Sequence, residues 1–406
     1  MTSTKFIQNK TALITLIAAC LVVLISLGVR QTFGLFFSDF KNDLDISLTE
    51  SGLAVGLQML MWGLSGPIFG AIADKYGGHK AIMLAFVFYI LGIYFLYSGP
   101  NTGIFFQIDM GLLVGIGLGG TAISIPMSIV GKHFPLSNRT IAMSLVTAVG
   151  SFGYFISPMY TSYSLINNGW IHTLYVFTIF LVIGLVIAFF VRSPSLSESI
   201  EKPSDQNTMS ALKEAFKTKS YVLLTAGFFV CGFHITLVGT HVPTYVIDRG
   251  LETWTAAAIL SLIGLFNIFG SLLSGYLSTK MKKKVILAVI YALRGISICL
   301  FIFLPASNIN AFIFGASFGF LWLSTVPATS GIVAHMFGTK HLGMLYGIVF
   351  LSHQIGSFFG SFLGGLFHDI YGSYDYAWYL AIALSIFAAI IHVPIKEEPV
   401  LRLKTE

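Results

Sequence analysis

Residues 11–37 read TALITLIAACLVVLISLGVRQTFGLFF, an apolar run with one internal cation, Arg30. A helix of about 20 mainly apolar residues covers the roughly 30 Å hydrocarbon core of a bilayer. Similar runs recur along the 406 residues, of which 55% are hydrophobic and 10% charged. They predict twelve transmembrane helices, at residues 11–37, 51–73, 80–99, 104–131, 140–163, 171–191, 221–246, 256–279, 285–304, 309–334, 343–366 and 376–394.

The predicted fold is all-α and polytopic, because the runs are continuous, whereas the strands of a membrane β-barrel alternate apolar and polar residues. One long polar stretch divides the chain near its midpoint. We expect an N-terminal six-helix half at residues 1–192, a cytoplasmic linker at 193–220 that includes a short amphipathic helix, and a C-terminal six-helix half at 221–406. The other connections are too short to form a soluble domain.

A short pattern is repeated in the two parts of the chain. The spacing Gly-x-x-x-Asp-x-x-Gly occurs at residues 70–77, after the second run, and again at residues 365–372, after the eleventh. The match is weak alone, but with the central linker it favours a duplicated fold of two pseudo-symmetric halves. In transporters built from such repeats, the substrate site lies between the repeats near the middle of the membrane.

The cations are distributed asymmetrically. With the amino terminus in the cytoplasm, only Lys41 and Arg249 of the 23 Lys and Arg residues fall on the outer side, and only Arg30 and Arg294 lie inside runs. The positive-inside rule therefore predicts a multi-pass protein of the cell (inner) membrane with both termini and the linker in the cytoplasm. The net charge of +6 reflects this topology, and no nucleic-acid partner is needed to explain it.

The loop at residues 70–80 reads GAIADKYGGHK. It closely resembles the signature of the major facilitator superfamily, which places Gly, Asp, a cation, Gly and further cations at this spacing between the second and third helices. The resemblance covers essentially the whole chain. It implies the major facilitator fold, with this loop latching the two halves in the outward-open state. The residues that it assigns to gating are Gly70, Asp74, Lys75, Gly77 and Lys80.

Within that superfamily, residues 132–142, KHFPLSNRTIA, and 260–271, LSLIGLFNIFGS, are similar to regions of monocarboxylate transporters and oxalate:formate antiporters. The resemblance implies a secondary transporter of monocarboxylates. In the eighth helix those transporters usually carry an Asp and an Arg four residues apart, where this chain has Asn267 and Ser271. Substrate anchoring and proton coupling by that pair therefore do not carry over.

Arg30 is the candidate that replaces the missing cation. It lies too deep in its run to reach the cytoplasmic surface, and a guanidinium there costs about 2.5–3.5 kcal/mol on insertion scales. An anionic ligand would offset that cost, because Arg binds a carboxylate with two parallel hydrogen bonds. The alternative is a structural role, with Arg30 bonded to backbone carbonyls or to Asp109. For Arg294 in the ninth run we expect the structural role, a bond to a neighbouring helix.

Histidine titrates near physiological pH and can carry a coupled proton. His234 and His241 are seven residues apart and share one face of the seventh run, and His353 lies in the eleventh. Together with the acid in the fourth run they form the set of proton-coupling candidates: Asp109, His234, His241 and His353. The alternative for each histidine is a neutral, hydrogen-bonded packing role.

We therefore expect a secondary active transporter that moves small organic anions, above all monocarboxylates, by alternating access. The candidate substrate-binding residues are Arg30, Gln31, Gln58, Tyr154, His234, Asn267, Trp322, His353 and Gln354. The alternative is an exporter of neutral or amphipathic compounds from the same superfamily.

The sequence contains no nucleotide-binding loop, metal-spaced cluster or nucleophile elbow. We therefore expect no enzyme activity, no cofactor and no metal. Transport would then use an ion gradient or exchange. The expected partners are the organic anion, a coupling proton and the lipid bilayer, and the expected state is a monomer.

Overall fold

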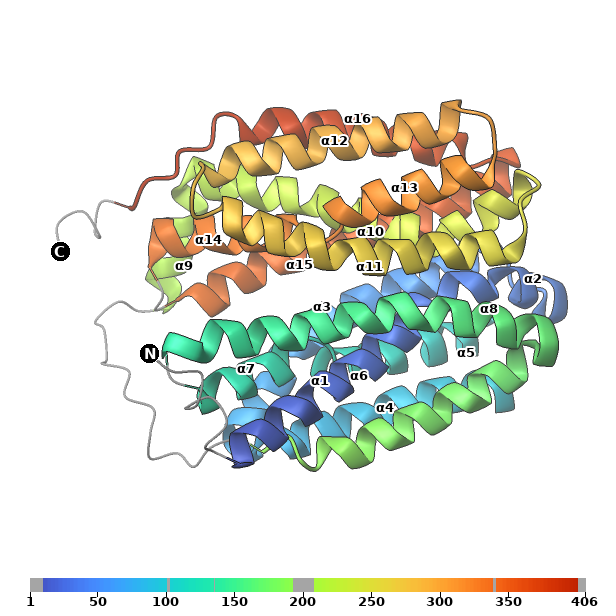
Figure 1. The fold of residues 1–406 in the computed structure, drawn as a ribbon, viewed down its shortest axis with the longest axis horizontal. Coiled ribbons are helices and arrows are strands. Elements are labelled where there is room, and N and C mark those ends of the chain that lie inside the picture. Colours follow the sequence, from blue (N-terminus) through green and yellow to red (C-terminus); the bar gives the residue numbers. More distant parts are fainter. Residues whose placement is uncertain (1–9, 101–102, 135, 193–207, 339–340, 401–406) are drawn as a thin grey trace.

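The computed structural model describes residues 10–100, 103–134, 136–192, 208–338 and 341–400, and over these residues the chain is helical with no strand (Figure 1). Eleven segments are long and apolar enough to cross a membrane. One of them, Ile141–Ala188, has 48 residues and folds back at Gly169, where φ is 78°. It therefore supplies two crossings, and the all-α fold with two six-helix halves is confirmed.

The N-terminal half contains the first six crossings. Its elements are α1 (Lys10–Gln31), η2 (Phe33–Phe36), α2 (Phe37–Leu44), α3 (Leu48–Tyr76), α4 (Gly78–Ser98), α5 (Gly103–Phe106), η3 (Gln107–Leu113), α6 (Val114–Thr121), α7 (Ser124–His133) and α8 (Leu136–Ala188).

The C-terminal half follows the linker helix α9 (Thr208–Lys217), which agrees with the short helix expected there. The remainder of the predicted linker, residues 193–207, lies outside the described residues. The elements of this half are α10 (Lys219–Asp248), α11 (Thr253–Leu277), α12 (Lys283–Phe303), α13 (Asn308–Leu321), α14 (Thr325–Phe337), α15 (Leu342–Tyr371) and α16 (Asp375–His392).

Two crossings that the sequence predicts as continuous are broken. The fourth crossing is interrupted between α6 and α7, and the tenth between α13 and α14. Pro126 and Pro327 lie just inside the second piece of each. Because proline has no N–H, the carbonyls of Ala122 and Leu323, four residues earlier, lose their helical partner, and the helix breaks there. The two breaks occupy corresponding positions in the two halves.

The two ends of the bundle differ in how the halves meet. We call the end that carries α9 and the α3–α4 turn the linker end, and the end that carries α2 and the α10–α11 turn the far end (Figure 1). Helices α3 and α15 form one seam between the halves. Near the far end, a Cβ added at Gly52 would overlap the Ser361 carbonyl oxygen, and one at Gly365 would overlap that of Leu48. The two backbones are therefore in direct contact.

The same face of α15 is open toward the linker end. Gly343 and Gly347 precede Gln354 by eleven and seven residues, so the three share one helix face. Gln354 contacts α3, but no atom of the described residues lies within 4 Å of a Cβ built at Gly343 or Gly347. The α3–α15 seam is thus closed at the far end and open at the linker end.

The α8–α11 seam has the same asymmetry. Gly264 of α11 packs against the backbone of Tyr154 and Phe155 in α8. Gly275, eleven residues later on the same face, has nothing within 4 Å of its Cβ position. Both seams therefore diverge toward the linker end.

Candidate functional site

Arg30 lies in the last turn of α1, shortly before the 3-10 turn η2. Its side chain is 8% exposed. One guanidinium nitrogen, Nη2, donates to the thioether of Met59 over 3.2 Å, and Nε has no partner. Among the described residues, no carboxylate lies within ion-pair distance of it. Neither form of the structural alternative, a bond to a backbone carbonyl or to Asp109, is seen for Arg30 among the described hydrogen bonds.

Gln31 has two buried polar atoms without partners. Its side chain is 2% exposed, and neither the amide nitrogen nor the amide oxygen makes a hydrogen bond. A small cavity of about 10 Å³ lies beside it, lined by Arg30, Gln31, Phe33, Gly34, Val55, Gly239 and Thr240. Buried polar groups almost always have partners, and this volume is close to what one water needs. The unpaired atoms therefore mark a polar space large enough for one water molecule.

The cavity lies between the two halves. Arg30, Gln31 and Gly34 come from the start of the chain, whereas Gly239 and Thr240 come from α10. A Cβ at Gly34 would overlap the Thr240 carbonyl oxygen. The backbones of η2 and α10 are therefore in contact on the far-end side of the cavity.

A chain of hydrogen bonds leads from Arg30 to α15. The Met59 thioether accepts from Arg30, and the Met59 carbonyl accepts from the Gln354 amide nitrogen over 3.0 Å. The Gln354 amide oxygen in turn lies 3.0 Å from Nδ1 of His353. The predicted residues Arg30, Gln354 and His353 are thus connected across the seam through Met59, a residue that the sequence analysis did not select.

Two predicted aromatic residues border the same region. Tyr154, which is buried, places its hydroxyl beside the Arg30 guanidinium. The Trp322 indole packs over Gly239, 3.5 Å from where a Cβ would stand. The first comes from α8 and the second from the break between α13 and α14.

The family model described as Major Facilitator Superfamily matches residues 19–325 and 293–405. The chain belongs to the Major Facilitator Superfamily. It is therefore a multi-pass membrane transporter of small molecules and not an enzyme.

Its relatives within the superfamily include members of the predicted branch. Monocarboxylate transporter 13 of Rattus norvegicus is 23% identical, with 87% of this chain and 82% of that protein covered. The oxalate:formate antiporter of Oxalobacter formigenes is also 23% identical, with 88% and 85% covered. The crystal structure of a D-xylose-proton symporter superposes with a TM-score of 0.74 at 14% identity, covering 96% of this chain and 99% of that one. That likeness shows the fold alone.

The superfamily signature loop keeps its contacts inside the N-terminal half. Asp74, at the end of α3, pairs with Lys132 of α7 at 2.7 Å. Gly77 has a φ of 97°, which favours glycine, and Lys75 lies over the Tyr76 ring. A Cβ at Gly70 would meet nothing closer than 3.8 Å, and Lys80 is exposed. None of these contacts reaches the C-terminal half.

Several predicted substrate contacts lie elsewhere in the major facilitator fold. His234 points to the peripheral helix α16, with Nε2 2.9 Å from the Ala381 carbonyl oxygen. His241 lies nearer the far end, with its Nε2 2.6 Å from the Ser361 carbonyl oxygen. Gln58 donates to the Met110 carbonyl within its own half. None of the three borders the Arg30 cavity.

Both polar atoms of the Asn267 amide are hydrogen-bonded to the protein. Its amide nitrogen donates to the Ser151 hydroxyl across the α8–α11 seam over 3.0 Å. Its amide oxygen accepts from the Leu323 backbone N–H over 3.0 Å and from the Ser271 hydroxyl. Asn267 therefore holds the break in the tenth crossing and the seam together. Sequence reasoning missed this role, because Pro327 was not read as the signal of a broken helix.

Two buried charged residues have contrasting surroundings. Arg294 is fully buried and donates to the carbonyls of Leu321 and Trp322 at the end of α13. The expected structural role of Arg294 is confirmed by these bonds. Asp109, 5% exposed, lies on η3, a π-helical segment, and no described cation pairs with it.

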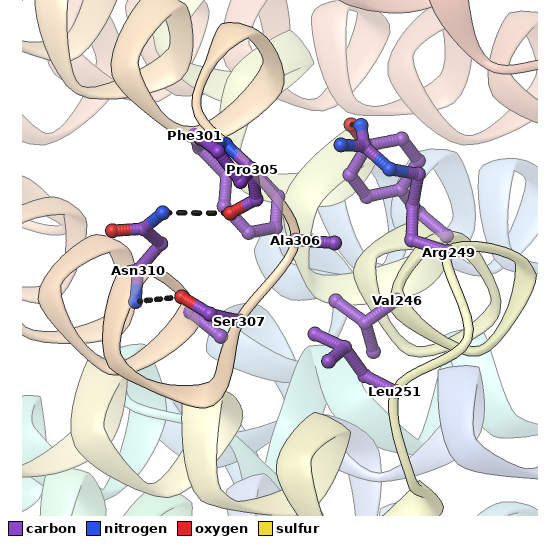
Figure 2. A pocket seen from close by; sticks show the side chains of 10 residues that line it. Val246, Arg249, Leu251, Phe301, Pro305, Ala306, Ser307 and Asn310 are labelled. Atoms are coloured by element: carbon purple, nitrogen blue, oxygen red, sulfur yellow. Dashed lines mark hydrogen bonds between the residues drawn. The ribbon is translucent and has the colours of Figure 1, made fainter.

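A second cavity of similar size lies within the C-terminal half near the far end (Figure 2). Arg249 and Asn310 are among its lining residues, and both have protein partners. Arg249 donates to the Tyr245 hydroxyl over 2.7 Å, and Asn310 donates to the Pro305 carbonyl over 2.7 Å. Because these groups are satisfied and the cavity is not between the halves, it lacks the features of the Arg30 cavity.

Proposed function

We propose that this chain is a secondary transporter of small organic anions, with monocarboxylates as the principal class. The observation that supports the proposal is the Arg30 guanidinium, buried between the halves without an acid partner and with Nε free. A carboxylate would offset its desolvation and accept two parallel hydrogen bonds from it. The unpaired amide of Gln31 supplies a further donor beside it.

The proposed mechanism is alternating access around this site. The seams between the halves are closed at the far end and diverge toward the linker end. With the linker end in the cytoplasm, as the positive-inside rule predicts, the structure corresponds to an inward-open state in the cell membrane. The loop at residues 70–80 would join the halves in the opposite state, when Asp74 exchanges Lys132 for a partner in the C-terminal half.

Among the four proton-coupling candidates, we assign the role to His353. It is the only one of the four that the described hydrogen bonds connect to Arg30, through Gln354 and Met59. Met59 only accepts hydrogen bonds, so this path carries no proton to Arg30; a proton on His353 would instead offset the negative charge of a carboxylate bound at Arg30. His234 and His241 remain packing histidines in this assignment, because both bond backbone carbonyls.

The direct test is uptake by the purified protein in liposomes, with labelled lactate, pyruvate and formate supplied with and without a proton gradient. Arg30→Ala should abolish saturable uptake. Lys41→Ala is the matched control, because Lys41 is an exposed cation in α2, further along the same crossing. Carboxylate uptake that is equal in Arg30→Ala and the control would contradict the anchor.

A ligand screen by thermal stability separates the proposal from export of neutral or amphipathic compounds. A ligand that binds only the folded protein raises its unfolding temperature. Small carboxylates should stabilise the chain, and Arg30→Ala should remove that effect. Stabilisation by hydrophobic cations instead would support the exporter.

A further inference from the structure

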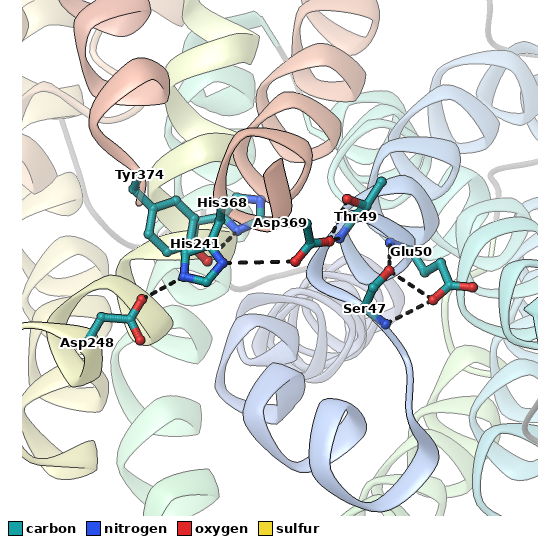
Figure 3. A network of polar contacts seen from close by, with 8 residues as sticks. All are labelled: Ser47, Thr49, Glu50, His241, Asp248, His368, Asp369 and Tyr374. Atoms are coloured by element: carbon teal, nitrogen blue, oxygen red, sulfur yellow. Dashed lines mark hydrogen bonds and ion pairs between the residues drawn. The ribbon is translucent and has the colours of Figure 1, made fainter. Parts of the chain in front are cut away.

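A second polar network joins the two halves at the far end (Figure 3). Asp369, near the end of α15, accepts hydrogen bonds from the backbone N–H and the hydroxyl of Thr49, over 2.7 and 2.6 Å. Thr49 is the second residue of α3. A carboxylate is stabilised at this position, because the first N–H groups of a helix lack partners within it and carry its positive dipole end.

The capping box at the start of α3 pairs the N–H groups of Ser47 and Glu50 and leaves that of Thr49 to Asp369. The Ser47 hydroxyl accepts from the Glu50 N–H, and the Glu50 carboxylate accepts from the Ser47 N–H, so the capping box is complete inside the N-terminal half. The additional pair of bonds from Thr49 therefore acts between the halves.

A histidine of its own half lies beside the Asp369 carboxylate. His368 lies with Nε2 3.1 Å from the Asp248 carboxylate of α10 and Nδ1 3.9 Å from the other oxygen of Asp369. One carboxylate oxygen of Asp369 thus accepts both hydrogen bonds from Thr49, and the other faces His368. The arrangement links α10, α15 and α3 at the far end (Figure 3).

The bonds of Asp369 can form only while this end is closed. Gly365, one turn before Asp369, has its backbone against the Leu48 carbonyl, next to Thr49. Any separation of α3 from α15 here would break the backbone contact and both hydrogen bonds together.

Asp369 belongs to the repeated spacing Gly-x-x-x-Asp-x-x-Gly at residues 365–372, as Asp74 belongs to the one at 70–77. Both motifs end on a glycine of positive φ, 97° at Gly77 and 69° at Gly372. Helices α3 and α15 are antiparallel, so the two acids lie at opposite ends of one seam (Figure 1). In this structure Asp369 holds the partner helix, whereas Asp74 holds Lys132 of its own half.

We propose that Asp369 is the latch that keeps the far end of the transporter closed. Losing both bonds of the carboxylate should shift the ratio of closed to open far ends at least about tenfold toward open, because even one hydrogen bond to a charged group contributes about that factor. The proposal uses the alternating-access part of the proposed function and is independent of the cargo.

The test measures the separation of the halves with no substrate present. Spin labels at Asn42→Cys in α2 and Ile309→Cys in α13 report the distance across the far end, in protein in lipid nanodiscs with Cys20, Cys231 and Cys299 replaced by serine. Asp369→Ala should add a population at longer distance. Asp375→Ala is the matched control, because Asp375 is an exposed acid at the same end of the same half that is not part of the network.

Thr49→Val keeps the shape of the side chain and removes only the hydroxyl, and it should produce a smaller shift in the same direction. It serves as the decisive variant if Asp369→Ala does not fold. Distance distributions that coincide with that of the Asp375→Ala control would overturn the latch. Because no cargo enters the measurement, this result is separate from the uptake test of Arg30.

Discussion

At the scale of single residues, Arg30 carries an unpaired charge that the fold does not neutralise. Its neighbours are the neutral thioether of Met59 and the Tyr154 hydroxyl, and Nε has no partner. Replacing even a buried ion pair by apolar residues of similar size is often neutral or stabilising by about 1–4 kcal/mol, and a buried ion without a counter-ion costs more. The Arg30 guanidinium therefore lowers the stability of the fold. Its presence is explained physically if it binds an anion.

Arg30→Met should therefore separate stability from function. We expect the unfolding temperature in detergent to stay equal or rise, while saturable carboxylate uptake is lost. Lys41→Met, at an exposed position, should change neither. A marked fall in the unfolding temperature of Arg30→Met would mean that the guanidinium is a structural group.

Asn267 should behave in the opposite way. Asn267→Ala removes the bonds to Ser151, Ser271 and the Leu323 N–H, and it leaves a buried N–H without a partner. We expect it to lower the free energy of unfolding by about 1–3 kcal/mol. Ser271→Ala, which removes only one of these bonds, is the control for the loss of the network. Equal unfolding temperatures for the two variants would argue against this role.

At the scale of elements, the effect of an alanine substitution on the face of α15 that meets α3 should depend on its position along the helix. A Cβ at Gly365 would overlap the Leu48 carbonyl, whereas one at Gly347 on the same helix meets open space. Gly365→Ala should destabilise this state by about 1–3 kcal/mol through overpacking. Gly347→Ala should be neutral or stabilising by up to about 1 kcal/mol, because Ala favours the helix over Gly.

Thermal unfolding of the two variants in the same detergent checks the difference. A similar effect of both substitutions would mean that the α3–α15 seam does not diverge toward the linker end.

The elements themselves were largely predictable, because length and hydropathy define each crossing. The breaks in the fourth and tenth crossings were missed, although Pro126 and Pro327 mark them at matching positions.

At the scale of the whole molecule, transport requires the far end to open. Thr49 and Asp369 are hydrogen-bonded across the halves, so cysteines at both positions should be joined by oxidation or by a short thiol-reactive cross-linker. The joined protein should lose uptake, and reduction should restore it. The control pair is Thr255→Cys with Asn308→Cys, two residues in contact at the same end within one half. Cross-linking of that pair should leave uptake unchanged, and uptake that persists in the Thr49–Asp369 pair would show that this end need not separate.

The sequence by itself determined the number of crossings, the superfamily and the position of Arg30 inside the membrane. Hydropathy and short-range spacing carry that information, because a bilayer imposes the same length on every crossing. The directions of the side chains were decided only by the tertiary structure. His234, His241 and Asn267 were selected by residue type, yet each bonds a neighbouring helix. Met59, Gly239 and Thr240 carry no sequence signal and nevertheless surround Arg30. Which face of each helix meets the other half depends on contacts between residues far apart in the chain, and one sequence does not encode those contacts in any local pattern.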